Sequence, residues 1–250
     1  MVRSVLRVTG ELLVTAGVVV LLFAGWLVVG TGWETAREQA AATDELRARW
    51  AAPGAVPGSV PGAEPVPGGT AGTREQGEPV LRLEVPRFGR AFTVLEGTAP
   101  DVLARGPGRY VGSTAPGEPG NLAVAGHRVT RGAPFDAAAT LQACDPLVVE
   151  TADTWWVYRV LPVGSVDGPV CGVDLPPAYA ALPGLRVVAP GDRDVLAPVP
   201  GRPGDAPSAA LLTLTTCHPR FSSRERLVVH AVLARAQPKA DGRPAELGSP

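Results

Sequence analysis

The chain has 250 residues, 45% of them hydrophobic, and a formal net charge of −1 at pH 7. This length allows one medium-sized domain with extensions. Because there is no basic excess to attract a phosphate backbone, the charge argues against nucleic acid as a partner. The 27 prolines and 30 glycines are unevenly spread, and this unevenness marks the boundaries between segments.

An uncharged apolar segment comes first. Residues 12–33 contain no charged side chain, and a helix of that length, at about 1.5 Å per residue, matches the ~30 Å hydrocarbon core of a bilayer. Arg3 and Arg7 precede it and Glu34 follows it, so the positive-inside rule predicts that residues 1–11 are cytoplasmic. The alternative is a cleaved signal peptide, but no small-x-small cleavage site follows, and the run exceeds the ~7–15 apolar residues of a typical signal. We predict a single-pass anchor in the cytoplasmic membrane, with the rest of the chain outside the cytoplasm.

A helical stalk and a tether are predicted next, over residues 34–79. Residues 34–52 are rich in helix formers and alternate in charge, which favours an extension of the anchor helix or a short solvated helix. Residues 53–79 loosely repeat valine, proline and glycine. Such a segment buries too little apolar surface to fold, and its prolines keep it extended.

Residues 80–236 have the pattern of an all-β domain. Short runs rich in valine, leucine and threonine are punctuated by glycine, proline and aspartate, as in β-sandwiches and barrels. The predicted strands are 80–86, 92–97, 121–127, 146–151, 155–166, 185–190, 210–216 and 226–234. One helix is predicted over 133–143, with Pro134 near its start. The polar, proline-rich residues 237–250 are predicted to be a disordered tail.

Three cysteines and three histidines are the residues best suited to metal binding or nucleophilic chemistry. No pair has the spacing of zinc ligands, so we expect neither a metal site nor a cofactor. Cys144 and Cys171 lie around the predicted hairpin of residues 146–166. In an oxidising space they can form a disulfide that leaves Cys217 as the odd thiol. The alternative is that the two cysteines are buried separately as small apolar residues. We predict the disulfide.

Cys217 is the candidate nucleophile. A lone thiol at the end of a core strand is usually a small hydrophobe, but three features set this one apart. It ends the run TLTT where Pro219 breaks the strand, which predicts a position at a rim. Three arginines follow closely, and a cationic setting favours the thiolate. The run AGH at 125–127 ends another predicted strand in the same manner and offers a histidine at a second rim.

His127 is the histidine that we expect to partner the thiol. His218 is adjacent to Cys217, and neighbours on a strand point to opposite faces. His230 lies inside the last predicted strand and is interpreted as a packed or surface group. His127 remains, and the fold rather than the sequence has to bring it close.

Arg226 is the arginine that we expect beside the thiol. It opens the final predicted strand, which should run back antiparallel beside 210–216. Its guanidinium is then expected to reach the vicinity of Cys217. Arg220 and Arg224 fall in the connecting loop and are predicted to be solvated.

Ordered motifs along residues 80–235 carry a family resemblance. They are LEVPRFG (83–89), GPGRYVGSTAPGEPGNLAVAGHR (106–128), GAPF (132–135) and TLTTCHPRFSSRERLVVHA (213–231). In this set the chain resembles the sortases, membrane-anchored cysteine transpeptidases of Gram-positive bacteria, and most of all the class E sortases of actinobacteria. It departs from that pattern at Cys144, where glycine is common before aspartate, and at Arg109, where histidine often precedes the tyrosine.

The resemblance implies a fold and a set of roles. The fold is a closed eight-stranded sortase-type β-barrel with one or two short helices and a groove at its rim. By their positions in these motifs, Cys217 matches the family's nucleophile, His127 its general acid and base, and Arg226 its active-site arginine. Tyr110 and Thr216 are candidate substrate contacts.

The resemblance also implies a reaction. The enzyme cleaves an L-A/P-x-T-G-like sorting signal of a secreted protein between threonine and glycine through a cysteine thioester. It then transfers the protein to an amine of a peptidoglycan precursor, with L-A-x-T-G preferred over L-P-x-T-G. The alternatives are a class D sortase, a hydrolytic cysteine peptidase or, outside enzymes, a tethered β-domain that binds a cell-wall ligand and uses Cys217 only for packing.

Overall fold

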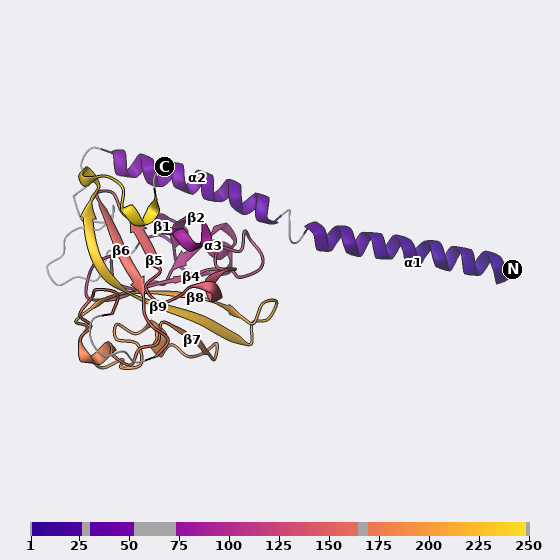
Figure 1. The fold of residues 1–250 in the computed structure, drawn as a ribbon. Coiled ribbons are helices and arrows are strands. Elements are labelled where there is room, and N and C mark those ends of the chain that lie inside the picture. Colours follow the sequence, from indigo (N-terminus) through magenta and orange to yellow (C-terminus); the bar gives the residue numbers. More distant parts are fainter. Residues whose placement is uncertain (1, 27–30, 53–73, 165–169, 249–250) are drawn as a thin grey trace.

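A computed structural model describes residues 2–26, 31–52, 74–164 and 170–248. Figure 1 shows a β-barrel with one long helix packed on it and another that extends away from it. The extending helix, α1 (Val2–Gly25), contains an apolar stretch, Leu6–Phe23, with a mean hydropathy of 1.9 and no part buried. By length and composition, α1 could cross a membrane.

The expected span of residues 12–33 is divided in the structure. Its first part lies in α1, whereas residues 31–33 begin a second helix, α2 (Thr31–Ala51). Residues 27–30 lie outside the described part of the chain. The apolar segment therefore supplies both a candidate span and the first turn of a helix that belongs to the domain.

The described strands form one sheet that closes on itself. They are β1 (Pro79–Val85), β2 (Arg90–Glu96), β3 (Gly108–Arg109), β4 (Gly120–Ala125), β5 (Pro146–Glu150), β6 (Thr154–Val160), β7 (Leu185–Val188), β8 (Ala210–His218) and β9 (Glu225–Pro238). Hydrogen-bonded neighbours follow the order β6-β5-β1-β2-β3-β4-β8-β9, and β9 pairs again with β6. The ring has the eight strands expected of a closed sortase-type barrel.

Strand β9 closes the ring because it is long enough to hold two partners on one edge. Its first part pairs with β7, with Val188 opposite Arg226, and its later part pairs with β6, with Val160 opposite Ala231. Strand β8 pairs along the other edge. β7 is therefore a ninth strand beside the ring rather than a member of it.

Strand β3 is the ring member that the sequence pattern missed. It has two residues, pairs parallel with β2 and antiparallel with β4, and shows no apolar run. A Cβ at Gly108 would lie 2.1 Å from the carbonyl oxygen of Gly97, so the close approach of the two backbones requires glycine there.

The two faces of β4, β8 and β9 differ in character. The inner face is apolar and contributes to the barrel core with Leu122, Val124, Leu212, Leu214, Leu227 and Val229. The outer face carries both polar side chains and apolar ones, such as Leu211 and Val232, and is covered by the connections between β6 and β8. There the side-chain amide of Asn121 donates to the carbonyl oxygens of Val195 and Ala197, each at 3.1 Å.

Helix α2 is docked on the barrel rather than solvated on all sides. Ala42 and Leu46 are buried against it. The Gln39 side chain accepts from the backbone N–H of Thr93 at 2.9 Å and donates to the carbonyl oxygens of Thr93 and Arg105, each at 3.0 Å. The proline-rich residues 53–73, which lie outside the described residues, thus join two segments that are both held on the barrel.

The remaining helices are short. They are α3 (Pro100–Arg105) and single 3₁₀ turns at Pro86–Phe88, Ala138–Thr140, Pro177–Tyr179, Asp194–Leu196, Lys239–Asp241 and Ala245–Leu247. The helix expected over 133–143 is wrong, because only one 3₁₀ turn forms there. Ala133 has a φ of 42°, outside the helical range, and Phe135 is fully buried in the core, so tertiary packing overrides helix propensity.

The C-terminal segment is packed, which corrects the expected boundary at residue 236 and the disordered tail. Strand β9 runs to Pro238, and the next residues fold back over the barrel. Glu246 pairs with Arg159 and Arg235, Arg243 with Glu84, and Leu247 packs on the cluster of Val148, Trp155 and Val157. Several ion pairs together hold this C-terminal segment on the barrel, although its sequence is too polar to predict packing.

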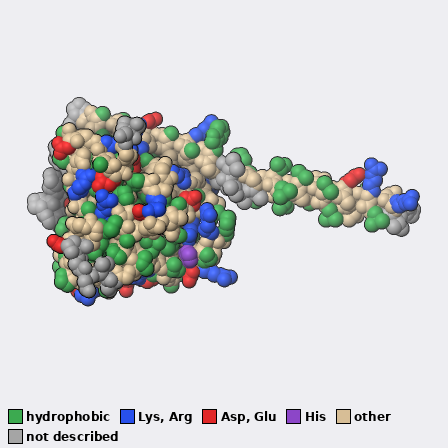
Figure 2. Space-filling view, in the orientation of Figure 1, with side chains coloured by type: hydrophobic (Ala, Val, Ile, Leu, Met, Phe, Trp, Pro, Cys, Tyr) green, Lys and Arg blue, Asp and Glu red, His purple; other side chains and the backbone are tan. Residues whose placement is uncertain are grey.

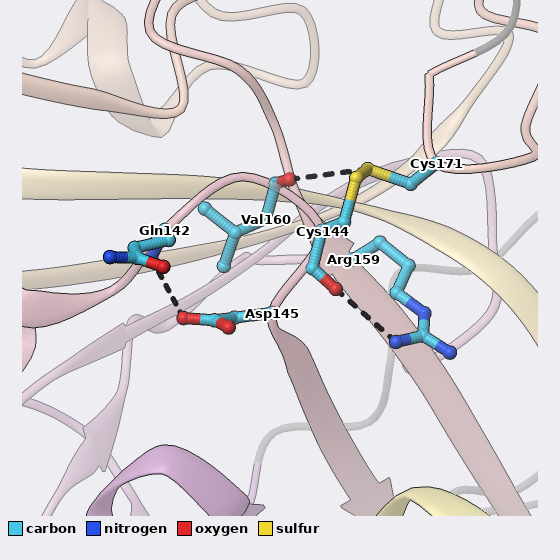
Figure 3. Close-up of a disulfide and its surroundings, with 6 residues drawn as sticks. All are labelled: Gln142, Cys144, Asp145, Arg159, Val160 and Cys171. Atoms are coloured by element: carbon cyan, nitrogen blue, oxygen red, sulfur yellow. Dashed lines mark hydrogen bonds between the residues drawn. A yellow bond between two sulfur atoms is a disulfide. The ribbon is translucent and has the colours of Figure 1, made fainter.

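Cys144 and Cys171 are joined by a disulfide, with their Cα atoms 5.3 Å apart (Figure 3). The backbone N–H of Cys144 donates to the carbonyl of Val160 at 2.8 Å, and Arg159 donates to the carbonyl of Cys144 at 3.2 Å. The bridge ties the segment that leads into β5 to the connection between β6 and β7. Of the two alternatives that the sequence leaves open, the structure has the bridge, and Cys217 is a free thiol.

Candidate active site

Cys217 and Arg226 face each other across the last two strands. Strands β8 and β9 are antiparallel, and their register pairs Cys217 with Arg226 and His218 with Glu225. Residues that are directly opposite in such a pair project from the same face. The thiol and the guanidinium therefore project from one face at the end of β8, where the thiol is partly exposed.

His127 reaches the same end of the sheet from the other side of β8. Strands β4 and β8 are parallel, and their register pairs Ala125 with Thr215. His127 lies two residues beyond the end of β4, and this register, continued that far, predicts that it lies beside Cys217 and projects from the same face. The backbone holds the approach, because the N–H of Gly126 donates to the carbonyl of Thr215 at 3.1 Å. We call the ends of β4 and β8 and the start of β9 the Cys217 rim.

The imidazole of His127 is half-buried at this rim. Burial lowers its pKa from the ordinary value of 6.5, and the nearby positive charge of Arg131 lowers it further. Both effects disfavour the imidazolium. The ring is therefore neutral at neutral pH and able to accept a proton.

The head group of Arg226 is held by its own loop. It donates to the carbonyl oxygens of Ser223 at 3.0 Å and Glu225 at 2.9 Å. These bonds leave further N–H donors of the planar fork available to a ligand at the rim.

His218 lies on the other face, as strand alternation predicts. Its Nδ1 is 2.7 Å from Nη1 of Arg128, which also donates to the carbonyl oxygen of Cys217 at 3.2 Å. Arg128 is buried, and its burial and the charge of Arg220 lower the pKa of its guanidinium. Sequence reasoning missed Arg128; its only signal is its position directly after His127.

His230 is not part of the rim. It is fully buried inside β9, with Nδ1 2.9 Å from the hydroxyl of Thr213, and burial lowers its pKa to about 3. Thr213 in turn donates to the side-chain oxygen of Asn121 at 2.7 Å. This neutral histidine belongs to a polar network beneath the outer face of the sheet.

A groove runs along the outer face from the rim. One cavity of about 490 Å³ is lined by Tyr110, Thr215, Arg226 and residues of the 188–196 segment. A second, of about 280 Å³, shares Tyr110 and continues past Asn121 and Ala123 along β4. The Tyr110 hydroxyl lies 3.0 Å from that of Thr215 on the groove floor.

Of the two candidate substrate contacts, only Tyr110 lines this groove. Thr216 projects from the opposite face of β8, is 4% exposed, and donates its hydroxyl to the carbonyl of Gly126 at 2.8 Å. The cause is strand alternation, which turns the neighbour of Cys217 away from the groove. Thr215 is the threonine that faces the groove instead.

Within the described ranges, no three side chains of histidine, cysteine, aspartate or glutamate are grouped so that they could hold a metal ion. The polar groups proposed to face the groove at the rim are the thiol of Cys217, the imidazole of His127 and the guanidinium of Arg226. These suit acyl transfer by a nucleophile, a proton carrier and an oxyanion donor.

Known proteins share this architecture. The family model described as Sortase domain matches residues 83–234. The chain is 29% identical to sortase SrtE1 of Streptomyces coelicolor over 97% of its own length, and it spans only 61% of that relative. It is 31% identical to sortase SrtE2 of the same organism, covering 94% of this chain and 84% of the relative.

Solved structures agree. The SrtF sortase of Corynebacterium diphtheriae matches with a TM-score of 0.64 and 36% identity, over 75% of this chain and all of that one. Sortase E1 of Streptomyces coelicolor, solved with a tripeptide in its active site, matches with a TM-score of 0.56 and 29% identity, over 68% of this chain and 97% of that one.

The closed barrel and its sequence motifs thus define a cysteine transpeptidase scaffold. The chain belongs to the sortase family, and its sequence relatives are class E sortases.

Proposed function

We propose that this sortase joins secreted proteins to the cell wall, with Cys217 as nucleophile, His127 as proton carrier and Arg226 as oxyanion donor. The observation that carries the proposal is the alignment of these three residues. The register of β8 and β9 pairs Cys217 with Arg226, and Arg226 lines the groove. The register of β4 and β8, continued by two residues, supports a position of His127 beside Cys217.

The proposed first half-reaction is acylation. Neutral His127 takes the thiol proton, and the thiolate of Cys217 attacks the threonine carbonyl of an L-A/P-x-T-G-like signal. Negative charge develops on the carbonyl oxygen, and the guanidinium of Arg226 stabilises it by about 3 kcal/mol. The imidazolium then protonates the departing glycine amine, which leaves a thioester on Cys217 and a neutral His127.

The second half-reaction is transfer. Neutral His127 accepts a proton as the amine of a peptidoglycan precursor attacks the thioester, and the thiol leaves with that proton. A peptide bond replaces the thioester, and the enzyme returns to its starting state. Water in place of the amine would give hydrolysis.

The groove is the proposed site for the sorting signal. It is open at the rim and floored by Tyr110 and Thr215, whose hydroxyls can hydrogen-bond an extended peptide. Support comes from sortase E1 of Streptomyces coelicolor, which was solved with a tripeptide in its active site. The alanine of L-A-x-T-G is the preferred second residue in the proposal, with Tyr110 at that position.

Membrane anchoring is a further part of the proposal. Helix α1 has the length and apolarity of a single span, with Arg3 and Arg7 near its start. This arrangement favours a cytoplasmic N-terminus and a catalytic domain outside the cytoplasmic membrane. Protease added to intact protoplasts should digest the domain; a protected domain would contradict this topology.

A comparison of hydrolysis with aminolysis tests the activity. The full chain in detergent is given a fluorescent L-A-x-T-G peptide with and without a glycine-based amine. A transpeptidase forms the ligated product in preference to the free acid, and Cys217→Ala forms neither. Release of free acid alone, whatever the amine concentration, would instead indicate a hydrolytic cysteine peptidase.

A further inference from the structure

The first turn of α2 lies against the loop that carries His127. Arg131 pairs with Glu34 at 3.4 Å. A cavity of about 290 Å³ lies beside this contact and is lined by Gly32 and Thr35 of the helix and by Arg131, Gly132 and Pro134 of the loop. The start of α2 and the Cys217 rim are therefore neighbours on one side of the barrel.

The chain between the two long helices is short. Trp26 is the last described residue after α1, and Thr31 is the first of α2. Five residues of extended chain span at most about 18 Å. If α1 crosses the membrane, as proposed above, this short connection between α1 and α2 keeps the start of α2 close to the lipid headgroups. The Cys217 rim, on the same side of the barrel, is then close to them as well.

The loop between β8 and β9 projects on the same side. Figure 1 shows the turn between these strands at the side of the barrel from which α1 leaves, and Figure 2 shows basic side chains and a histidine on that side. The loop also lies near the residue that follows His127, because the charge of Arg220 in the loop lowers the pKa of Arg128.

This loop has the chemistry of a membrane-surface contact. Phe221 is 83% exposed, and Arg220 and Arg224, on either side of it, are exposed as well. Residues 219–224 contain no acidic side chain. An exposed aromatic ring favours the headgroup region, and arginines near the surface are attracted to anionic lipids.

A second aromatic residue lies near the start of α2. Trp33 is 68% exposed, and the guanidinium of Arg37 lies 4.3 Å from its ring centre. Tryptophan is enriched at the membrane–water interface. Two separate segments, α2 and the β8–β9 loop, thus present aromatic and basic groups on the side where α1 leaves.

We propose that the β8–β9 loop binds the outer surface of the anchoring membrane, with Phe221 in the interfacial region and Arg220 and Arg224 on anionic phospholipid headgroups. The inference rests on the proposed membrane span. As a consequence, the thiol of Cys217 would lie close to the lipid headgroups rather than far from the membrane surface.

Spin labels on the full chain in lipid nanodiscs test this contact. Cys217→Ala removes the described free thiol, and Phe221→Cys then gives a labelling site in the loop. The measured quantity is the ratio of the label's accessibility to oxygen to its accessibility to a polar nickel complex. This ratio should be several-fold higher in discs that contain phosphatidylglycerol than in discs of phosphatidylcholine alone. Reversing both charges with Arg220→Glu and Arg224→Glu should lower the share of bound loop by roughly tenfold or more.

Two matched sites make the outcome unambiguous. Gly204→Cys lies before the other end of β8, where a Cβ meets open space, and its label should stay in water in both kinds of disc. Arg202→Glu is a charge reversal on an exposed side chain in that same region, and it should leave the label at position 221 unaffected.

A label at Val14→Cys tests the membrane span of α1 separately from the contact of the β8–β9 loop with lipid. If position 14 is in hydrocarbon and position 221 is equally water-accessible in both lipids, the loop contact is wrong and the anchor stands. If position 14 is also in water, both are wrong. An unchanged position 221 after charge reversal would overturn the role of the two arginines.

Discussion

The two faces of β8 divide the work of the protein. Leu212 and Leu214 project into the barrel core, whereas Thr213, Thr215 and Cys217 project to the outer face. Each of these two threonines has a polar partner, and Cys217, the next-to-last residue of the strand, is a free thiol. Alternation along a single strand thus keeps the residues of the barrel core on one face and places the groove residue Thr215 and the thiol of Cys217 on the other. Substitutions on the two faces should therefore fail in different ways.

The largest effect on turnover short of losing the thiol is expected from His127→Ala. Loss of proton transfer should lower kcat/KM by about 10²–10⁴-fold, while the melting temperature changes little because His127 follows β4 at the rim. His218→Ala is the matched control, because His218 lies on the other face against Arg128. Peptide turnover by both variants checks the assignment, and equal damage would reopen the choice of histidine.

On the inner face, Leu214→Ala should show the opposite pattern. The side chain is 1% exposed, so its truncation leaves a cavity and should lower the free energy of unfolding by about 2–5 kcal/mol. Thermal unfolding in detergent measures the loss. The fraction that stays folded should keep near-normal kcat, and a large loss of kcat in fully folded protein would break the division between the faces.

Arg226→Lys should slow acylation by roughly a hundredfold with little change in KM. Lysine keeps the charge but loses the planar fork, so the transition state loses stabilisation that the bound peptide does not use. Arg224→Ala is the control from the same loop and should be mild. Single-turnover acylation rates check both, and a rise in KM without a fall in kcat would assign Arg226 to peptide binding.

The smallest predicted effect is a shift in the pH profile. Since the pKa of His127 lies below its ordinary 6.5, the neutral base persists to lower pH, and activity should be lost as the pH falls through that lowered pKa. Arg131→Gln removes a repulsive charge and should move this acid limb of kcat/KM to higher pH. An acid limb that does not move would show that another group controls it.

Much of this arrangement could be predicted from the sequence because it depends on local rules. Strand alternation separates His218 from Cys217, and an antiparallel return places Arg226 opposite the thiol. The same alternation distinguishes Thr215, which lines the groove, from the expected contact Thr216, which projects from the opposite face.

Other features could not be predicted because they depend on long-range contacts. The two-residue β3 forms only because Gly108 allows another backbone to approach, and helix propensity over 133–143 yields to the burial of Phe135. Arg128 looks like any solvated arginine in the sequence, yet it is buried against the backbone of Cys217. The docking of α2 likewise depends on Gln39 meeting backbone groups of distant segments.

The most direct test of the account is mass spectrometry of the full chain after incubation with an L-A-x-T-G peptide and rapid acid quenching. The account predicts a mass increase equal to the acyl fragment ending in threonine, located on Cys217 and lost on treatment with hydroxylamine. Cys217→Ala should show no adduct. Turnover of the peptide by Cys217→Ala, or an adduct on another residue of the active protein, would contradict the assignment of Cys217 as the nucleophile.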